Sequence, residues 1–327
     1  MLAVSFLLAV VAAAQPPPAG NPLRLAVHAD GSYTLSHASW PALALTSGPI
    51  GVQLRGAWLS PADKSLLLQG PPVVAPGSDS WGAFNATTLT WAAAAAPGTP
   101  LVVASFRVYA DAPAVAFSAS FPGGLATGEN GTRGKDGVAA AFPSWALPAA
   151  GPLGFFQWAG PFINRGVDGP PTGKWVAPGA GLTGGMSGGP LVLLDGTAAG
   201  GTSGALVLAP GSEFMATSVA ITGGAGSEAV SVGPLGSLAE LPPGWAYDYV
   251  AWAGTGVNAA VEAWGAAMMG RYGKPRDLSK SDYTNTHLIY NTDHGAYYYY
   301  QTGAYANYSV ALDAVYNCKF GETLGRA

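Results

Sequence analysis

The residues best suited to chemistry lie in a polar and aromatic segment near the end of the chain. The segment Tyr290–Tyr300 contains a carboxylate, Asp293, and a run of tyrosines that starts at Tyr297. It follows an apolar stretch, residues 286–291, that predicts a buried strand. Aromatic rings cover the apolar C–H faces of sugars, and a carboxylate accepts hydrogen bonds from hydroxyl groups. We therefore expect Asp293 and Tyr297 to contact carbohydrate. The alternative is that the tyrosines alternate between core and solvent while Asp293 shapes a turn.

A second group of aromatic residues lies in the glycine-rich stretch 151–204, which predicts long loops joining short strands. Aromatic side chains at this density either anchor a loop to a core or line a ligand cleft. Trp158 is the third residue that we expect to contact sugar. The same stretch holds Gly185-Met186-Ser187-Gly188-Gly189, which has the spacing of a serine nucleophile loop. We reject that interpretation for two reasons. Met186 stands where trypsin-like proteases have an acidic residue, and none of the four histidines lies in the sequence setting of their catalytic base.

The sequence predicts no metal site and no cofactor. The four histidines are far apart, none is paired at metal-ligand spacing, and no phosphate-binding glycine loop with a lysine is present. The single cysteine, Cys318, excludes an internal disulfide, so a hydrophobic core must hold the fold together.

Most of the chain predicts short antiparallel strands. From Leu23 to about Val250, strand-like segments alternate with turns rich in glycine, proline, aspartate and asparagine, which is typical of a sandwich. One hairpin is expected from Leu23 to Leu35, with Asp30-Gly31 supplying positive φ angles in a tight turn. A second is expected between residues 101–109 and 114–121. In its first arm, the positions of Val102 and Phe106 form the apolar face that should be buried.

The period of the apolar pattern changes near residue 255. Val257, Val261, Trp264, Met268 and Tyr272 recur three or four residues apart and predict one amphipathic helix. The polar stretch 274–282 predicts a linker, and the strand 286–291 follows it. A further helix is expected after Asn307 or Ser309, with its apolar positions at 312, 315 and 316.

Three segments resemble the glycosidase-like proteins of the α-galactosidase and raffinose-synthase group: Phe156-Gln157-Trp158-Ala159-Gly160-Pro161-Phe162, Arg271-Tyr272-Gly273-Lys274, and the stretch from Thr292 to Tyr300. The resemblance spans residues 150–316 at most. It implies a large N-terminal β-sandwich that leads through a helix into a (β/α)8 barrel. His294 stands where the group would have an asparagine.

The resemblance also implies a retaining mechanism with two carboxylates about 5 Å apart. These residues would lie on later barrel strands. From Tyr283 to Ala327 there are 45 residues, whereas a barrel takes roughly 250. We therefore expect no catalytic residues in this chain and no activity from it alone. The expected parts are a signal peptide at 1–14, a mainly β, antiparallel sandwich at 15–250, a connecting helix and linker at 251–282, and the first strand-helix unit of a truncated barrel at 283–327.

The N-terminal sequence and the composition indicate the cellular location of the protein and the classes of partner that it can bind. The apolar run from Leu2 to Ala13 with small residues up to Ala14 predicts a signal peptide, hence a secreted protein. Asn85, Asn130 and Asn307 begin glycosylation sequons. The net charge of −4 and the dispersed basic residues exclude nucleic acid as a partner, and no stretch suits a membrane span. Carbohydrate is the expected partner. Two alternatives stay open: a lectin-like sandwich that binds glycan without the C-terminal part, and a structural extracellular protein.

Overall fold

The computed structural model describes residues 20–128, 137–159, 171–179, 181–184, 188–195, 204–224, 226–274, 278–287 and 310. The chain divides into two compact units, Met1–Tyr272 and Gly273–Ala327. The predicted signal peptide at 1–14, the residues Asp293 and Tyr297, and the sequons at Asn130 and Asn307 lie outside the described residues.

The first unit consists mainly of strands. In chain order these are β1 (Leu23–Val27), β2 (Tyr33–His37), β3 (Trp40–Thr46), β4 (Gly51–Leu54), β5 (Ala57–Leu59), β6 (Leu66–Leu68), β7 (Val73–Asp79), β8 (Gly82–Ala93), β9 (Val102–Tyr109), β10 (Ala114–Phe121), β11 (Leu125–Ala126), β12 (Ala140–Ala141), β13 (Ser144–Ala146), β14 (Leu153–Ala159), β15 (Thr172–Lys174), β16 (Gly188–Asp195), β17 (Ala205–Pro210), β18 (Thr217–Thr222), β19 (Ala229–Pro234), β20 (Glu240–Leu241) and β21 (Trp245–Gly254). One longer helix, α1 (Val257–Arg271), ends the unit.

A ten-stranded antiparallel sheet forms the main layer. Its strand order is β15-β14-β16-β17-β21-β10-β9-β8-β6, with β7 paired to β8. Three three-stranded sheets, β1-β2-β3, β12-β4-β5 and β13-β19-β18, and the pair β11-β20 complete the strand pairing among the described residues. This confirms the predicted mainly β, antiparallel fold.

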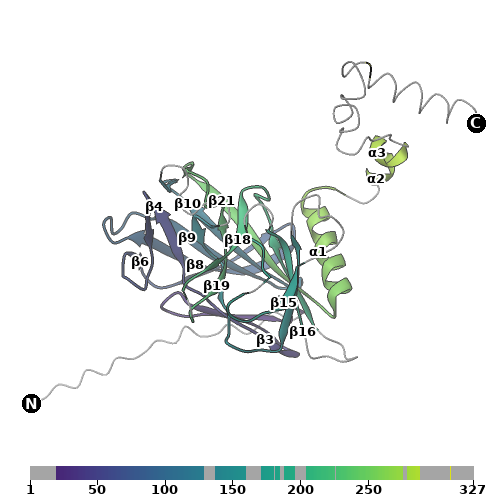
Figure 1. The fold of residues 1–327 in the computed structure, drawn as a ribbon, viewed down its shortest axis with the longest axis horizontal. Helices are drawn as coiled ribbons and strands as arrows, with labels where there is room; N and C mark the ends of the chain where they lie inside the picture. The colour runs from purple at the N-terminus through teal and green to yellow at the C-terminus, as the bar shows by residue number, and fades with distance from the viewer. Residues whose placement is uncertain are drawn as a thin grey trace, which may run out of the picture. The chain divides into compact units, whose positions relative to one another are not determined.

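The two faces of the ten-stranded sheet are both apolar, because alternate residues along a strand point to opposite faces. Phe106, Phe117 and Tyr249 pack on one face with Leu35 and Val230 of the small sheets, and together they form the main core. The neighbouring positions point to the other face. There, a smaller cluster that includes Ala116, Val207, Val250 and Trp252 packs against Ala260 of α1. Figure 1 shows α1 lying beside the strands rather than between the sheets. We call these the inner and the outer face.

Both predicted hairpins are present. β1 pairs with β2 from Leu23 opposite His37 to Val27 opposite Tyr33. β9 pairs with β10, and Val102 and Phe106 are buried as expected. The first turn differs from the expected two-residue form: it runs over residues 28–32, and only Gly31 has a positive φ, of 85°. Asp30 stabilises this turn by a different route, because its Oδ1 accepts hydrogen bonds from the backbone N and the Oγ of Ser32.

Helix α1 lies where the change of period predicted it and ends one residue before Tyr272, which caps it. The contact with the sheet is close at its first turn. Ala260 is fully buried, and a Cβ added to Gly254 would lie 2.5 Å from the backbone N of Ala260. Among the described residues, no helix is long and apolar enough to cross a membrane.

The described part of the second unit is short. Helix α2 (Leu278–Ser281) lies within the expected linker, and α3 (Tyr283–Thr286) follows it. Asp282 caps α3 by accepting a hydrogen bond from the backbone N of Thr284 at 2.8 Å. Of the expected strand 286–291, only Thr286, which ends α3, and His287 are described. The helix expected after Asn307 or Ser309 lies outside the described residues except for Val310.

Candidate functional site

Trp158 is an exposed aromatic side chain held in place on β14. It is 45% exposed, and its ring packs edge-on against Phe156 with the ring centroids 5.2 Å apart. Phe156 in turn packs on the outer-face cluster. Between them, Gln157 is fully buried and exchanges two hydrogen bonds of 2.9 Å with the backbone of Thr183. The sequence therefore fixes an aromatic surface at this position that remains open to solvent.

The strand pairing around Trp158 is irregular. The register between β14 and β16 shifts between Gln157 and Ala159. At this bulge the chain of β16 approaches so closely that a Cβ added to Gly189 would lie 1.6 Å from the carbonyl oxygen of Trp158. Glycine is required there, because any other residue would separate the two strands.

Of the three residues predicted to contact sugar, Trp158 is the one that lies in the described part of the chain. Asp293 and Tyr297 lie outside it. Ser187 of the rejected nucleophile loop also lies outside it. The sequon residue Asn85 lies on β8, opposite Pro76 of β7 and Val108 of β9, and is half-buried. No group of three or more histidine, cysteine or acidic side chains comes together as a metal site within the described ranges.

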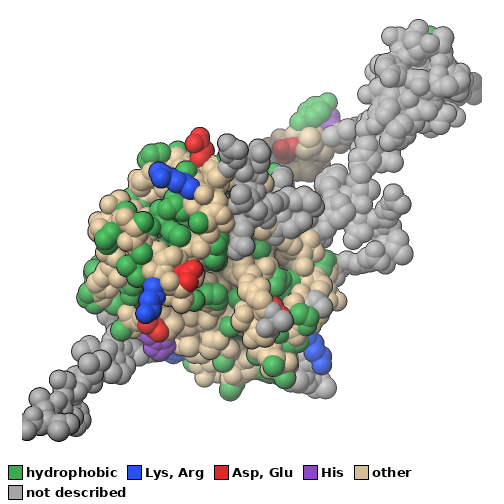
Figure 2. Space-filling view, turned by 60° about the vertical axis from the view of Figure 1, so that its left-hand side comes forward, with side chains coloured by type: hydrophobic (Ala, Val, Ile, Leu, Met, Phe, Trp, Pro, Cys, Tyr) green, Lys and Arg blue, Asp and Glu red, His purple; other side chains and the backbone are tan. Residues whose placement is uncertain are grey.

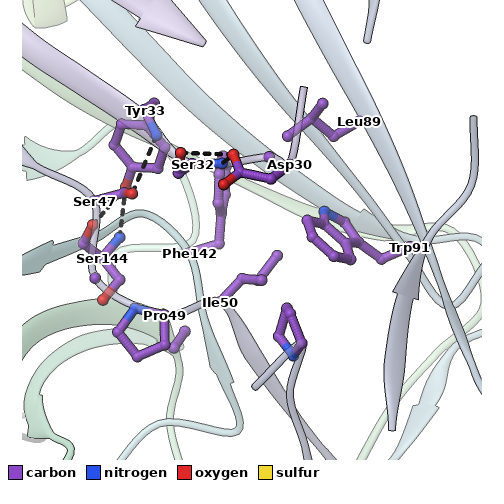
Figure 3. Close-up of a pocket in the computed structure, with 14 residues that line it drawn as sticks. Asp30, Ser32, Tyr33, Ser47, Pro49, Ile50, Leu89, Trp91, Phe142 and Ser144 are labelled. Carbon is purple, nitrogen blue, oxygen red and sulfur yellow. Dashed lines mark hydrogen bonds between the residues drawn. The ribbon is translucent and has the colours of Figure 1, made fainter. Parts of the chain in front are cut away.

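A pocket opens on the inner side of the ten-stranded sheet, beneath the β1–β2 turn (Figure 3). Its volume is about 190 Å³. Asp30 and Pro49 are exposed at its rim, while Leu89, Trp91 and Phe142 are buried within it. We call it the turn pocket.

Several polar groups that line the turn pocket already form hydrogen bonds within the protein. The Tyr33 hydroxyl donates to the Ser144 carbonyl at 2.7 Å, and burial raises the pKa of Tyr33 above its usual value. The Ser47 hydroxyl accepts a hydrogen bond from the backbone N of Tyr33. The hydrogen bonds from Ser32 lower the pKa of Asp30, so this carboxylate is ionised at neutral pH.

A charged cluster lies on the outer face and joins α1 to the sheet. The Arg107 guanidinium pairs with Asp248 at 2.6 Å and with Asp79 at 3.2 Å. Arg271, the last residue of α1, pairs with the other oxygen of Asp248 at 2.5 Å and lies over the Trp81 ring. Each carboxylate is therefore matched by at least one arginine, and the charges of the cluster offset one another.

The electrostatics of Asp248 follow from these partners. Burial alone would raise the pKa of its carboxyl group, but Arg107 and Arg271 together with the Ser118 hydroxyl hold the pKa below its usual value. A carboxylate that is kept ionised and paired is a poor general acid. The cluster therefore fastens α1 rather than performing chemistry.

Sequence reasoning missed both the turn pocket and the charged cluster. The Asp30-Gly31 signal located the turn, but nothing in the sequence placed Trp91 beneath it. Similarly, the sequence presents Arg271 only as part of a resembling segment, because its partner Asp248 is 23 residues away.

No family model matches this sequence, and no curated protein matches it. The GH36 α-galactosidase AgaA from Geobacillus stearothermophilus is structurally similar, with a TM-score of 0.46 and 10% identity over 75% of this chain and 41% of that one. A doubly substituted AgaA solved with raffinose gives a TM-score of 0.47, 11% identity and the same coverage. The α-galactosidase from Lactobacillus brevis gives 0.44 and 8%, over 78% of this chain and 41% of that one.

This chain therefore spans about two-fifths of the length of those proteins. The structural similarity to the α-galactosidases is partial.

Proposed function

We propose that this chain is a glycosidase-like, carbohydrate-binding protein, in which the sandwich contributes Trp158 to the binding of sugar. Asp293 and Tyr297 are proposed as further contacts from the C-terminal unit. The observation that carries the proposal is Trp158 itself: a large aromatic side chain that is 45% exposed and yet fixed by Phe156 and by the buried Gln157. A fixed aromatic face costs little entropy when it stacks on a sugar ring.

Exposed apolar side chains are scattered over the face drawn in Figure 2, and Trp158 differs from the other exposed apolar side chains of the first unit in being a fixed, flat ring. Met215 is 76% exposed and Val73 is 64% exposed, but neither offers a flat ring. Phe214 offers one and is 51% exposed, in edge contact with Tyr272. Phe214 therefore serves as the matched control, because it has similar exposure and an aromatic neighbour but lies elsewhere, in the turn between β17 and β18.

The experiment is a calorimetric titration of the purified chain with galactose-containing oligosaccharides such as raffinose. Trp158→Ala should weaken binding about tenfold, equivalent to about 1.4 kcal/mol, and Phe214→Ala should leave it unchanged. Equal affinity of Trp158→Ala and the unaltered chain would contradict the proposal.

We also propose that the chain alone does not hydrolyse glycosides, since the carboxylate pair of the retaining mechanism is expected on barrel strands beyond the one predicted here. Release of the aglycone from an aryl α-galactoside by the purified chain would contradict this. Loss of that release on Asp293→Asn, with Asp111→Asn as control, would identify the group responsible.

Export is proposed from the N-terminal sequence alone. If residues 1–14 are a signal peptide, the protein recovered from the medium of a secreting host should begin at Gln15. Mass spectrometry of that material would also show whether Asn85 carries a glycan. A product that retains Met1 inside the cell would refute export.

A further inference from the structure

We propose that Asn85 carries an N-linked glycan that covers the exposed apolar side chains of β7, and that this cover keeps copies of the chain from associating through β7. The proposal rests on the proposed export, because only a chain that enters the secretory pathway meets the glycosylating enzymes. The glycan thus protects one edge of the ten-stranded sheet.

The strand β7 lies at this edge. β8 pairs with β9 along one side, and along its other side it pairs first with β7 and then with β6. Among the described strands, β7 pairs only with β8. One side of its backbone is therefore available to another chain. Pro76 has no N–H to offer there, but the other residues of β7 keep theirs.

The side chains of β7 add an apolar surface to this available backbone. Val73 is 64% exposed, Val74 is 49% exposed, and Pro76 is exposed as well. The charged residue of β7, Asp79, does not interrupt this surface, because it pairs with Arg107. Figure 2, in which the side of the molecule that carries β6 comes forward, shows only scattered charged side chains. An exposed apolar edge of this kind favours association between chains.

The opposite edge of the same sheet is protected differently. There, β15 has only three residues, and its last residue, Lys174, is exposed. A short edge strand and an exposed lysine are two devices by which proteins prevent pairing at an edge. β7 has seven residues and neither a lysine nor an arginine. Apart from Pro76, its protection must come from outside the strand.

The sequon of Asn85 lies directly beside β7. Its three residues pair with three residues of that strand: Asn85 with Pro76, Ala86 with Ala75, and Thr87 with Val74. Asn85, Pro76 and Val74 point to the same face, because alternate residues of a strand share a face. Opposite Cβ atoms lie about 4.5–5.5 Å apart, and diagonal neighbours lie about 7–8 Å apart. The first sugar on Asn85 therefore reaches both Pro76 and Val74.

The Asn85 side chain can carry this sugar in the folded protein. Its amide nitrogen is not buried, and it has no hydrogen-bond partner within the described ranges. Transfer from a lipid-linked oligosaccharide forms a bond between this nitrogen and C1 of the first sugar. The bond between C1 and the lipid pyrophosphate breaks, and the amide loses one proton. Because Asn85 and Thr87 are half-buried in the sheet, this transfer precedes the pairing of β8.

The test is production of the full chain with its own N-terminus in a glycosylating, secreting host. Mass spectrometry of the peptide that contains Asn85 should find a glycan on it. Asn85→Gln and Thr87→Val each remove the sequon. Each should lower the concentration at which half of the chain is dimeric by about tenfold or more, the effect of two or more hydrogen bonds. Analytical ultracentrifugation measures this concentration, and Thr87→Ser, which keeps the sequon, should not change it.

Lysine substitutions in the Asn85→Gln chain locate the associating surface. Val74→Lys places a charge on β7 and should restore the monomer. Met215→Lys is the matched control, because Met215 is 76% exposed but lies in the turn between β17 and β18. It should leave the dimer intact. Restoration of the monomer by both lysines, or by neither, would show that the chains associate elsewhere and would overturn the proposal.

The outcomes separate this proposal from the proposed export. A chain that stays inside the cell with Met1 would refute both. An exported chain without a glycan on Asn85 would refute the glycan alone. If the glycan is present but Asn85→Gln and Thr87→Val dimerise no more readily than the unaltered chain, its protective role is refuted. Circular dichroism of both variants checks that they fold, and the binding of sugar by Trp158 is measured independently.

Discussion

Asp248 of β21 connects this strand to three other elements, β9, β10 and α1. One of its carboxylate oxygens accepts from Arg107 on β9 and from the Ser118 hydroxyl on β10, and the other accepts from Arg271 at the end of α1. Its side chain is only 16% exposed, so water screens these pairs weakly. Removing one member of such a group leaves its partners with uncompensated charge, which costs more than the pairing itself contributes.

We therefore expect Asp248→Asn to lower the free energy of unfolding by about 2–3 kcal/mol, somewhat less than for a fully buried pair, because Arg107 keeps Asp79. The folded-state pKa of Asp248 is lowered. Its contribution is therefore present above the unfolded pKa of about 3.9 and is lost as the pH falls through the folded value. The difference between the two proteins, measured by urea denaturation, should be full at pH 7 and shrink toward pH 3.

Asp111→Asn is the control, since Asp111 is exposed in the β9–β10 turn. It should change the stability little at either pH. A difference between Asp248→Asn and the unaltered chain that stays constant from pH 7 to pH 3 would mean that the ionised carboxylate is not the stabilising group.

At the level of single residues, sequence and structure agree only in part. The density of aromatic residues around Trp158 predicts that it contacts a ligand, and its side chain is exposed. Trp91 has the same type and an equally apolar setting but is buried under a turn 60 residues earlier in the chain. Exposure depends on which strands cover a residue, and this depends on pairings between distant segments that the local pattern does not contain.

The β1–β2 hairpin depends on Gly31 for two separable reasons. Its φ of 85° is in the left-handed region, and an added Cβ would lie 2.6 Å from the Trp91 ring. Gly56 has a similar φ of 87°, but an added Cβ would meet nothing within 4 Å. Gly56→Ala should therefore cost about 1–2 kcal/mol from backbone strain alone, and Gly31→Ala should cost more. Equal losses in chemical denaturation would show that Trp91 moves aside freely.

The contact of α1 with the sheet depends on Gly254 in β21. Gly254→Ala would push a methyl group against the backbone of Ala260, the one fully buried residue of the helix. We expect it to destabilise the protein by about 1–3 kcal/mol, as overpacking does. The opposite sign is expected for Gly265→Ala, because Gly265 lies within α1 with nothing near its Cβ position. There, the higher helix propensity of alanine should add up to about 1 kcal/mol.

Thermal unfolding monitored by circular dichroism would show both effects as shifts of the midpoint in opposite directions. A midpoint raised by Gly254→Ala would indicate that α1 is not packed on β21 as described.

Among the elements, those defined by local signals were predicted and those defined by distant pairing were not. The turn residues between segments of alternating apolar and polar residues predicted both hairpins. The change in the period of the apolar pattern predicted α1. The ten-stranded order could not be predicted, because β21 lies between β10 and β17 and its neighbours come from different parts of the chain. Likewise, the predicted apolar face of α1 included Met268 and Tyr272. Of the five predicted positions, Val257, Val261 and Trp264 do pack on the outer-face cluster, whereas Met268 and Tyr272 do not belong to it. Ala260 is buried in addition, since only a small residue fits where the helix meets Gly254.

For the first unit as a whole, α1 covers apolar residues on the outer face of the ten-stranded sheet. Trp252 and Val250 of β21 would be exposed to water without α1, and Arg107 and Asp248 would lose their link to Arg271. The Tyr272 hydroxyl also donates to the Gly211 carbonyl at 2.5 Å. Tyr272 is also the last residue of this unit.

This boundary leads to a prediction about truncation. A chain that ends at Lys274 should unfold cooperatively, with the same midpoint as the full chain, because it keeps α1, Arg271 and Tyr272. A chain that ends at Gly256 loses all three, exposes the apolar outer-face cluster and should aggregate or unfold at a markedly lower temperature. Calorimetry and size-exclusion chromatography of the two truncated chains would measure the difference. If both were equally stable, α1 would contribute nothing to the first unit; if both were equally unstable, the sandwich would require residues of the C-terminal unit to fold.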